Sequence, residues 1–284
     1  MATVGVFDSG IGGLSVLQAL RAELRQSRFI YIADSGHAPY GERSDAYVMA
    51  RSQAIAAELL SRQVQAVVIA CNTATAVAIE QLRADHPALP IIGVEPALKP
   101  ALALSQTRRI GVMATRSTLA SIKFKALLAS LTGQAEFVLQ PCDGLADAIE
   151  RSASSNDTSD IKSLCTQYTQ AMGSFGSNSG QIDTLVLGCT HYPFAAEQLR
   201  NLLGPQVQLI SNGPAVARQT RIKLLGLVSP ATFQAEPCQT ANFQAVSPLT
   251  LLSTGEPRVL QAAGQRWLTQ TPAEPAYFAS KLNL

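Results

Sequence analysis

Two of the five cysteines, Cys71 and Cys189, stand where apolar runs of the sequence end and polar residues begin. Cys71 opens the run C-N-T, and Cys189 opens the run C-T-H-Y-P. Hydroxyl and amide side chains at the start of a helix can bind carboxylates, and the helix dipole there favours a thiolate. A single cysteine at the end of an apolar strand is more often a small buried hydrophobic residue. A second cysteine in the same context favours acid/base chemistry by a pair of thiols.

The other cysteines, Cys142, Cys165 and Cys238, have no such neighbours and are expected to be structural. The five are odd in number and widely spaced, and none forms a C-x-x-C pair. That spacing predicts free thiols rather than disulfides, zinc ligands or a redox pair.

Two further side chains could move protons together with these thiols. His191 lies two residues after Cys189, and an imidazole that titrates near neutrality can assist a neighbouring thiol. Asp8, at the end of another apolar run, could play the matching part beside Cys71. Metal ligation by Cys189 and His191 is disfavoured because no further ligand residues cluster with them. We therefore expect no metal here.

The glycine-rich turn D-S-G-I-G-G covers residues 8–13. It could cradle a phosphate, but it lacks the lysine of a P-loop and its spacing is not G-x-G-x-x-G. Taken alone, its glycines would merely allow a tight turn between a strand and a helix. Asp8 and Ser9 at its start favour a part in a site, because ligands of parallel sheets bind beyond the carboxyl ends of the strands.

Short apolar runs that alternate with amphipathic stretches must position these residues. Such runs are typical of strands buried on both faces, in parallel sheets covered by helices. We therefore predict an α/β fold. The expected strands are Thr3–Phe7, Phe29–Ile32, Ala66–Ala70 and Ile91–Val94 in the first half, and Arg109–Met113, Glu136–Leu139, Thr184–Leu187 and Val207–Ile210 in the second.

Two local resemblances within the chain indicate an internal duplication. T-V-G-V-F-D-S is similar to R-I-G-V-M-A-T, and V-V-I-A-C-N-T is similar to L-V-L-G-C-T-H. We therefore predict two lobes built on one plan, facing each other and each supplying one cysteine. Residues 1–97 and 211–268 are expected to form the first lobe and residues 98–210 the second, with a C-terminal tail over 269–284 whose weak pattern supports no structural prediction.

Composition narrows the class of protein. A chain of 284 residues with a hydrophobic share of 47% can bury more than one core. The 22 Lys and Arg residues nearly balance the 20 Asp and Glu residues, so no nucleic-acid or acidic-membrane surface is expected. The N-terminus lacks the pattern of a signal peptide, and no apolar run approaches the ~20 residues of a spanning helix. We expect a cytoplasmic enzyme.

Five blocks occur in order along the chain: D-S-G-I-G-G-L-S-V, P-Y-G-E-R, A-C-N-T-A, V-E-P-A-L-K-P and G-C-T-H-Y-P. Together they resemble the bacterial glutamate racemases of the aspartate/glutamate racemase family, from Val4 to about Leu268. The resemblance implies two flavodoxin-like lobes related by a pseudo-twofold axis, with an active site in the cleft between them and no metal or organic cofactor. It also implies a homodimer that makes D-glutamate for peptidoglycan.

The resemblance further implies roles by matched position. Cys71 and Cys189 would be acid/base thiols on opposite faces of the substrate α-carbon, one removing a proton while the other donates one. Asp8 and His191 would assist them. Because this α-proton is very weakly acidic, the site must supply a desolvated base and dense hydrogen bonding. The residues implied to bind glutamate are Asp8, Ser9, Tyr40, Gly41, Asn72, Thr73, Thr190 and His191.

Two alternatives stay open at this point. A related racemase could act on aspartate, although His191 after the second Cys-Thr pair resembles the glutamate enzymes, whereas aspartate enzymes typically carry an acidic residue there. A protein of another class could bind a small acidic ligand without catalysis, and its activity would survive replacement of either cysteine.

Overall fold

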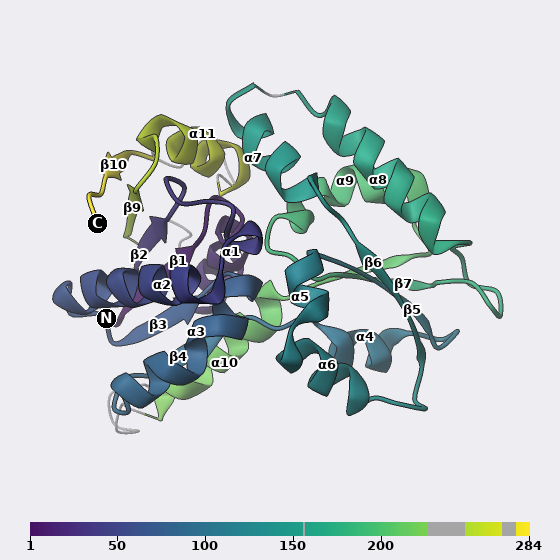
Figure 1. Ribbon diagram of the computed structural model, residues 1–284, viewed down its shortest axis with the longest axis horizontal. Helices are drawn as coiled ribbons and strands as arrows, with labels where there is room; N and C mark the ends of the chain where they lie inside the picture. The colour runs from purple at the N-terminus through teal and green to yellow at the C-terminus, as the bar shows by residue number, and fades with distance from the viewer. Residues whose placement is uncertain (156, 227–247, 269–276) are drawn as a thin grey trace, which may run out of the picture.

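The structure is a computed structural model that describes residues 1–155, 157–226, 248–268 and 277–284. The chain forms two α/β lobes, each built around a parallel sheet (Figure 1). Of the sequence predictions, the structural role of Cys238 lies outside the described residues. So do parts of the predicted first-lobe segment and of the predicted tail.

The first lobe contains a six-stranded sheet in the order β10-β9-β2-β1-β3-β4. All of its pairings are parallel. Its strands are β1 Thr3–Asp8, β2 Arg28–Ala33, β3 Ala66–Ile69, β4 Ile91–Gly93, β9 Leu249–Ser253 and β10 Ala279–Lys281. Residues near the C-terminus therefore complete a sheet that begins at residue 3.

The second lobe contains a four-stranded parallel sheet in the order β6-β5-β7-β8. Its strands are β5 Arg109–Ala114, β6 Glu136–Pro141, β7 Thr184–Leu187 and β8 Gln208–Ser211. This order repeats β2-β1-β3-β4 of the first sheet, strand for strand in chain order, and it is the order with which flavodoxin-like sheets begin. The predicted fold class, two flavodoxin-like α/β lobes with parallel sheets, is confirmed.

Helices cover both faces of each sheet (Figure 1). The helices of the first lobe are α1 Leu14–Glu23, α2 Asp45–Ser61, α3 Asn72–Asp85, α10 Gly213–Leu225 and α11 Pro257–Trp267, with a 3₁₀ turn η1 Tyr40–Glu42. Those of the second lobe are α4 Leu98–Leu104, α5 Arg116–Ala120, α6 Ile122–Ala129, α7 Leu145–Ser155, α8 Ser159–Met172 and α9 Ala196–Leu203, with a 3₁₀ turn η2 Tyr192–Ala195.

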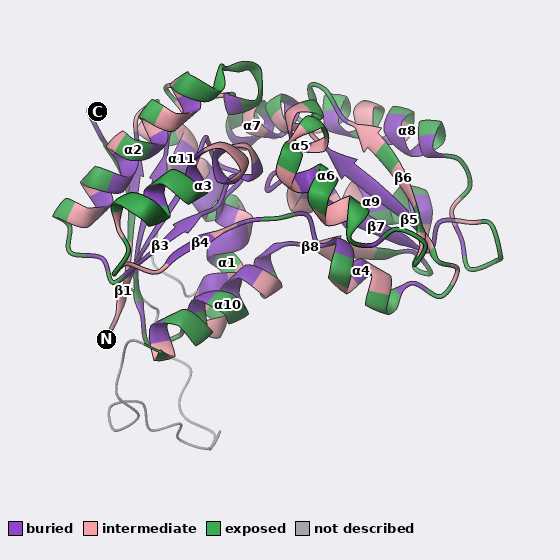
Figure 2. Cartoon of the chain, turned by 60° about the horizontal axis from the view of Figure 1, so that its bottom comes forward, coloured by how far each residue is buried: buried purple, intermediate pink, exposed green. Residues whose placement is uncertain are grey.

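The continuous apolar runs of the strands follow from burial on both faces. Along β1, Val4 and Val6 point into a core shared with α1, α10 and α11, whereas Phe7 points into a second core shared with α2 and α3. Successive side chains of a strand alternate between faces, so a sheet covered on both sides needs apolar residues at consecutive positions. Figure 2 shows the result, with buried strands inside and helices whose exposed residues face outward.

The lobes touch through several elements near the carboxyl ends of their strands. The Ser15 hydroxyl of α1 donates to the Thr190 carbonyl at 2.7 Å. Helix α11 of the first lobe packs against α7 of the second. Its last residue, Trp267, stacks on Phe194 of η2 with ring centroids 4.2 Å apart and planes 13° from parallel. No helix within the described ranges is long and apolar enough to cross a membrane.

Candidate active site

The predicted acid/base residues lie at the carboxyl ends of β1, β3 and β7. Asp8 ends β1, Cys71 follows β3 as the N-cap residue of α3, and Cys189 follows β7. Cys71 is only 5% exposed and Cys189 7% exposed. The two thiols are close enough that the charge of Cys189 would raise the pKa of Cys71. The fold therefore brings one cysteine from each lobe to a shared, water-poor location.

The Cys71 thiol lies among donors that would stabilise its charged form, but burial outweighs them. The Ala74 N–H points at its sulfur at 3.5 Å, and the sulfur is 3.8 Å from the Ser9 hydroxyl. Burial, followed by the nearby Asp8 charge, nevertheless raises the pKa of Cys71 well above its usual value. The N-terminus of α3 therefore acts on Cys71 in the predicted direction, but desolvation of the buried thiol exceeds its effect.

Asp8 carries a buried carboxyl group whose pKa is raised toward neutrality. Its Oδ2 accepts a hydrogen bond from the Gly13 N–H at 2.8 Å, whereas its buried Oδ1 has no partner among the described residues. Burial raises the pKa of Asp8 from 3.8 to about 6, even though His191 and the Gly13 N–H act in the opposite direction. A carboxyl group of this kind can take and return a proton at physiological pH.

The second thiol has an imidazole and a carboxylate beside it. The Cys189 sulfur lies 3.7 Å from His191 Nδ1, and His191 Nε2 lies 2.8 Å from Glu150 Oε1. Burial alone would lower the pKa of His191, but its hydrogen bonds with Cys189 and Glu150 outweigh burial and hold that pKa well above the ordinary value. His191 is therefore held as a protonated or readily protonated group beside the thiol.

The surroundings of Cys189 differ from the prediction in one respect. The sequence predicts a helix N-terminus directly after both cysteines, and this is correct for Cys71 and α3. Cys189 instead precedes the 3₁₀ turn η2, whose Tyr192 N–H donates to the Cys189 carbonyl at 3.1 Å. The duplicated plan has diverged here: a 3₁₀ turn follows Cys189, and the full helix α9 begins only at Ala196.

The glycine-rich turn of residues 8–13 leaves room for Glu150 and His191 of the second lobe. A Cβ atom at Gly10 would overlap Glu150 Oε1, and one at Gly12 would overlap the His191 ring. The Ile11 N–H donates to Glu150 Oε1 at 2.7 Å. The interpretation that these glycines merely allow a tight turn is thus insufficient, because they also let the second lobe approach the backbone.

The predicted substrate-binding residues Ser9, Asn72 and Thr190 are all buried around the two thiols. Both polar atoms of the Asn72 side-chain amide are buried and have no hydrogen-bond partner among the described residues. Buried polar groups are normally paired, so an amide in this position indicates a ligand that would complete it. Thr73 is partly exposed, and its hydroxyl lies 3.4 Å from that of Ser117 in the second lobe.

The P-Y-G segment contributes in a different way. The Tyr40 hydroxyl donates to Asp34 Oδ2 at 2.5 Å, so it is occupied within the first lobe, and the predicted part of this segment in binding would fall to the backbone of Tyr40 and Gly41. A Cβ atom at Gly41 would lie 3.3 Å from the Ser117 hydroxyl. The segment therefore closes against the second lobe beside Thr73.

A groove leads from this point to the surface. It has a volume of about 780 Å³ and runs between α2 and α3 of the first lobe and α5 and α6 of the second. Thr73 and Ser117 lie in its wall, and Lys123 forms an ion pair with Glu80 across it at 3.1 Å. Within the described part of the chain, no three His, Cys, Asp or Glu side chains are grouped to hold a metal ion.

Three polar residues of this region were assigned no role from the sequence. Asp34 directly follows β2 as Asp8 ends β1, so the strand-end rule that finds Asp8 also finds Asp34. Arg51 on α2 and Glu150 on α7 carry no such signal. Their neighbours in space, Asp34 and His191, are fixed only by the packing of helices against the sheets.

Comparison with known proteins defines the class. A family model described as Asp/Glu/hydantoin racemase matches residues 5–220. The chain is 48% identical over 224 residues to a glutamate racemase of Cupriavidus pinatubonensis, covering 79% of each chain. It is 45% identical over 271 residues to a glutamate racemase of Ralstonia pickettii, covering 95% of this chain and 89% of that one. The chain belongs to the Asp/Glu/hydantoin racemase family.

Solved structures place it more narrowly within that family. The Escherichia coli glutamate racemase in complex with L-glutamate and the activator UDP-MurNAc-Ala superposes with a TM-score of 0.79 at 29% identity, over 99% of this chain and 98% of that one. The glutamate racemase of Francisella tularensis in complex with D-glutamate gives a TM-score of 0.75 at 25% identity, over 99% and 97%. The predicted resemblance to bacterial glutamate racemases is confirmed.

Proposed function

We propose that this chain is a glutamate racemase that interconverts L- and D-glutamate by proton transfer between the α-carbon and two thiols, without a cofactor. The observation that carries the proposal is that two buried cysteines, one from each lobe, each lie beside a proton-transfer group of their own. Asp8 stands near Cys71, and the His191–Glu150 pair stands beside Cys189.

The proton transfers balance because one proton leaves the α-carbon on one face while another proton reaches it on the opposite face. A thiolate on one face takes the α-proton, and the electron pair left on the α-carbon takes a proton from the thiol on the other face, so the configuration inverts. At Cys71 the Asp8 carboxylate accepts the thiol proton that must first leave. At Cys189 the imidazolium of His191 gives a proton to the thiolate that is left after Cys189 has protonated the α-carbon. In the reverse reaction the two thiols exchange roles.

Binding of glutamate is assigned to the predicted residues around these thiols. The unpartnered Asn72 amide and the hydroxyls of Ser9, Thr73 and Thr190 supply donors for carboxylates, together with the backbone around Gly41. The free Asp8 Oδ1 is suited to the substrate ammonium group. These uncharged donors at a dry site would also strengthen as negative charge develops on the substrate.

The decisive experiment separates the two faces. Wild-type protein incubated with either enantiomer of glutamate in heavy water should give the opposite enantiomer carrying one α-deuterium. Cys71→Ser and Cys189→Ser should both lose racemisation, and each should exchange the α-proton of a different enantiomer, because only one face keeps its base. Cys165→Ser, at a buried cysteine outside this site, is the matched control.

Two outcomes would contradict the proposal. Equal behaviour of the two cysteine variants toward the enantiomers would exclude a division of labour between faces. Racemisation that survives either replacement would exclude thiol catalysis altogether. A panel of D- and L-amino acids that includes aspartate tests the substrate, since a faster reaction with aspartate would favour the aspartate racemase alternative.

The cellular role follows from the product. We infer that the enzyme acts in the cytoplasm as a homodimer and supplies D-glutamate for peptidoglycan. Growth of a strain that requires external D-glutamate, restored by this chain but not by Cys71→Ser, tests the role. Sedimentation of the purified protein tests the dimer.

A further inference from the structure

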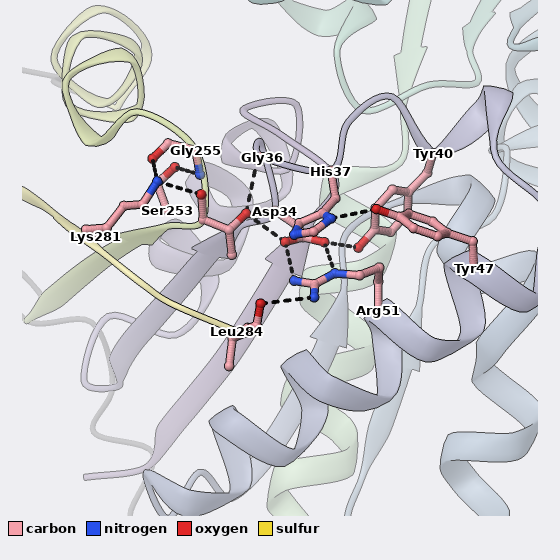
Figure 3. A network of polar contacts seen from close by, with 11 residues as sticks. Asp34, Gly36, His37, Tyr40, Tyr47, Arg51, Ser253, Gly255, Lys281 and Leu284 are labelled. Atoms are coloured by element: carbon pink, nitrogen blue, oxygen red, sulfur yellow. Dashed lines mark hydrogen bonds and ion pairs between the residues drawn. The ribbon is translucent and has the colours of Figure 1, made fainter.

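A network of polar groups holds the side chain of Tyr40, the first residue of η1 (Figure 3). Its centre is Asp34, which is fully buried. Arg51 of α2 forms a two-pronged contact with Asp34, with Nε 3.0 Å from Oδ2 and Nη2 2.9 Å from Oδ1. The Tyr40 hydroxyl donates to Oδ2 at 2.5 Å and the Thr254 hydroxyl to Oδ1 at 2.7 Å. Four donors thus saturate one carboxylate.

The partners of Asp34 come from separate parts of the first lobe. Arg51 belongs to α2, Tyr40 to η1 and Thr254 to the end of β9, and the Thr254 hydroxyl also accepts from the Gly36 N–H at 3.1 Å. Lys281 in β10 donates to the Thr254 carbonyl at 2.8 Å. Residues late in the chain therefore brace the loop between β2 and η1.

The charge state of Asp34 depends on this network. Burial raises the pKa of a carboxyl group, but the hydrogen bonds from Arg51, Tyr40 and Thr254 outweigh burial, and the pKa of Asp34 lies below its usual value. Arg51 supplies the only positive charge in direct contact with Asp34 among the described residues, and its side chain is itself only 12% exposed. Without Arg51, an ionised carboxylate would be left buried and unpaired.

We propose that Arg51 is a positioning residue for the substrate-binding segment 37–41, acting through Asp34 and Tyr40. This inference rests on the proposed function, in which that segment contributes backbone donors to glutamate. Arg51 keeps Asp34 ionised, the ionised Asp34 fixes the Tyr40 ring by a charge-assisted hydrogen bond, and the fixed ring sets the backbone of Tyr40 and Gly41. The hydrogen bonds of the Arg51 side chain go to Asp34 and Leu284, and none goes to either thiol.

The test compares Arg51→Met with Arg62→Met, a change of similar size at the C-cap residue of the same helix, where Arg62 forms an exposed ion pair with Glu58. Arg51→Met should raise KM for both enantiomers about tenfold while kcat changes less than about threefold, because binding geometry is lost and the proton-transfer groups are untouched. Arg51→Lys should recover part of the loss, since lysine restores the charge but not the two-pronged contact. Arg62→Met should behave as wild type.

Hydrogen exchange gives a readout that does not depend on activity. Amides of residues 37–43 should exchange faster in Arg51→Met than in wild type or Arg62→Met, whereas those around Cys189 should not change. If wild-type protein fails to racemise glutamate, the proposed function fails, and the exchange result still decides the role of Arg51. Unchanged exchange together with unchanged KM overturns the inference.

A second variant covers the case in which Arg51→Met does not fold. Asp34→Asn/Arg51→Met removes both charges, so no buried carboxylate is left unpaired. We expect this protein to fold and to show a raised KM and faster exchange over residues 37–43, because the charge-assisted hold on Tyr40 is gone. A wild-type KM and wild-type exchange in this variant would show that the pair has no positioning role.

Discussion

The two thiols of the cleft differ in the group that stands beside each of them. Cys71 has the carboxyl group of Asp8, whose pKa burial raises to about 6, and Cys189 has an imidazole whose pKa is raised by Cys189 and Glu150. A carboxylate is suited to accept a proton and an imidazolium to donate one. The reaction proposed here is symmetric in its substrates, but the residues that perform it are chemically distinct on the two faces.

The raised pKa of Asp8 makes a prediction about stability. Between pH 4 and 6 the folded protein binds more protons at Asp8 than the unfolded chain does, so this residue destabilises the fold increasingly as pH rises through that range. The shift from 3.8 to about 6 corresponds to about 3 kcal/mol at neutral pH. Asp8→Asn should therefore be more stable than wild type at pH 7.5 by up to about 3 kcal/mol, although catalysis is lost.

Urea denaturation at pH 7.5 and pH 4 measures this difference. The advantage of Asp8→Asn should shrink to about 0.6 kcal/mol at pH 4, because the folded-state carboxyl is then protonated and the unfolded one is about half ionised. Asp85→Asn, at the exposed end of α3, is the control for a simple change of net charge. A stability difference that is the same at both pH values would show that hydrogen bonding, and not the charge of Asp8, determines the effect.

At the scale of elements, the turn after β1 must lack side chains at Gly10 and Gly12 so that α7 and the start of η2 can pack against its backbone. Gly10→Ala should push Glu150 away from His191 and the Ile11 N–H, because the added methyl group overlaps the carboxylate. Overpacking of this kind typically costs about 1–3 kcal/mol. We expect kcat/KM to fall at least about tenfold, since the orientation of His191 depends on Glu150.

Gly226→Ala is the matched control, because a Cβ atom at Gly226 would meet nothing closer than 3.6 Å. Steady-state racemisation and thermal unfolding of both variants measure the effect. Activity in Gly10→Ala equal to that of Gly226→Ala would mean that Glu150 can move without consequence for His191.

The strands could be predicted well from the sequence, because burial on both faces leaves a continuous apolar signature. Each of the eight predicted strands lies within two residues of an observed one. β9 and β10 were not predicted. β10 has only three residues, two of them polar, and its place depends on pairing with β9 rather than on its own apolar content.

The site residues also differ in whether a local pattern of the sequence marks them. Asp8, Cys71 and Cys189 follow apolar strands and could be found by the rule that sites gather at strand ends. Glu150 could not, because its contact with His191 depends on how α7 packs against η2, which no local pattern encodes. Roles for the predicted residues and the lobe boundaries stay predictions.

At the scale of the whole molecule, duplication and closure act together. The two sheets share a four-strand order, and in each a cysteine follows the third of these strands along the chain, so one plan used twice brings one buried thiol from each lobe to the shared location. Both thiols are nearly inaccessible in this conformation. We therefore expect that substrate enters by separation of the lobes, and that the lobes part beside the groove where Thr73 lies near Ser117.

The stack of Trp267 on Phe194 gives this motion an optical signature. Trp267 is the only tryptophan of the chain, and Phe194 belongs to the turn that follows His191. Tryptophan fluorescence of this protein therefore reports only on the boundary between the lobes. Opening should expose the indole to water and shift its emission to longer wavelength, so stopped-flow fluorescence of the unlabelled protein can time lobe separation directly.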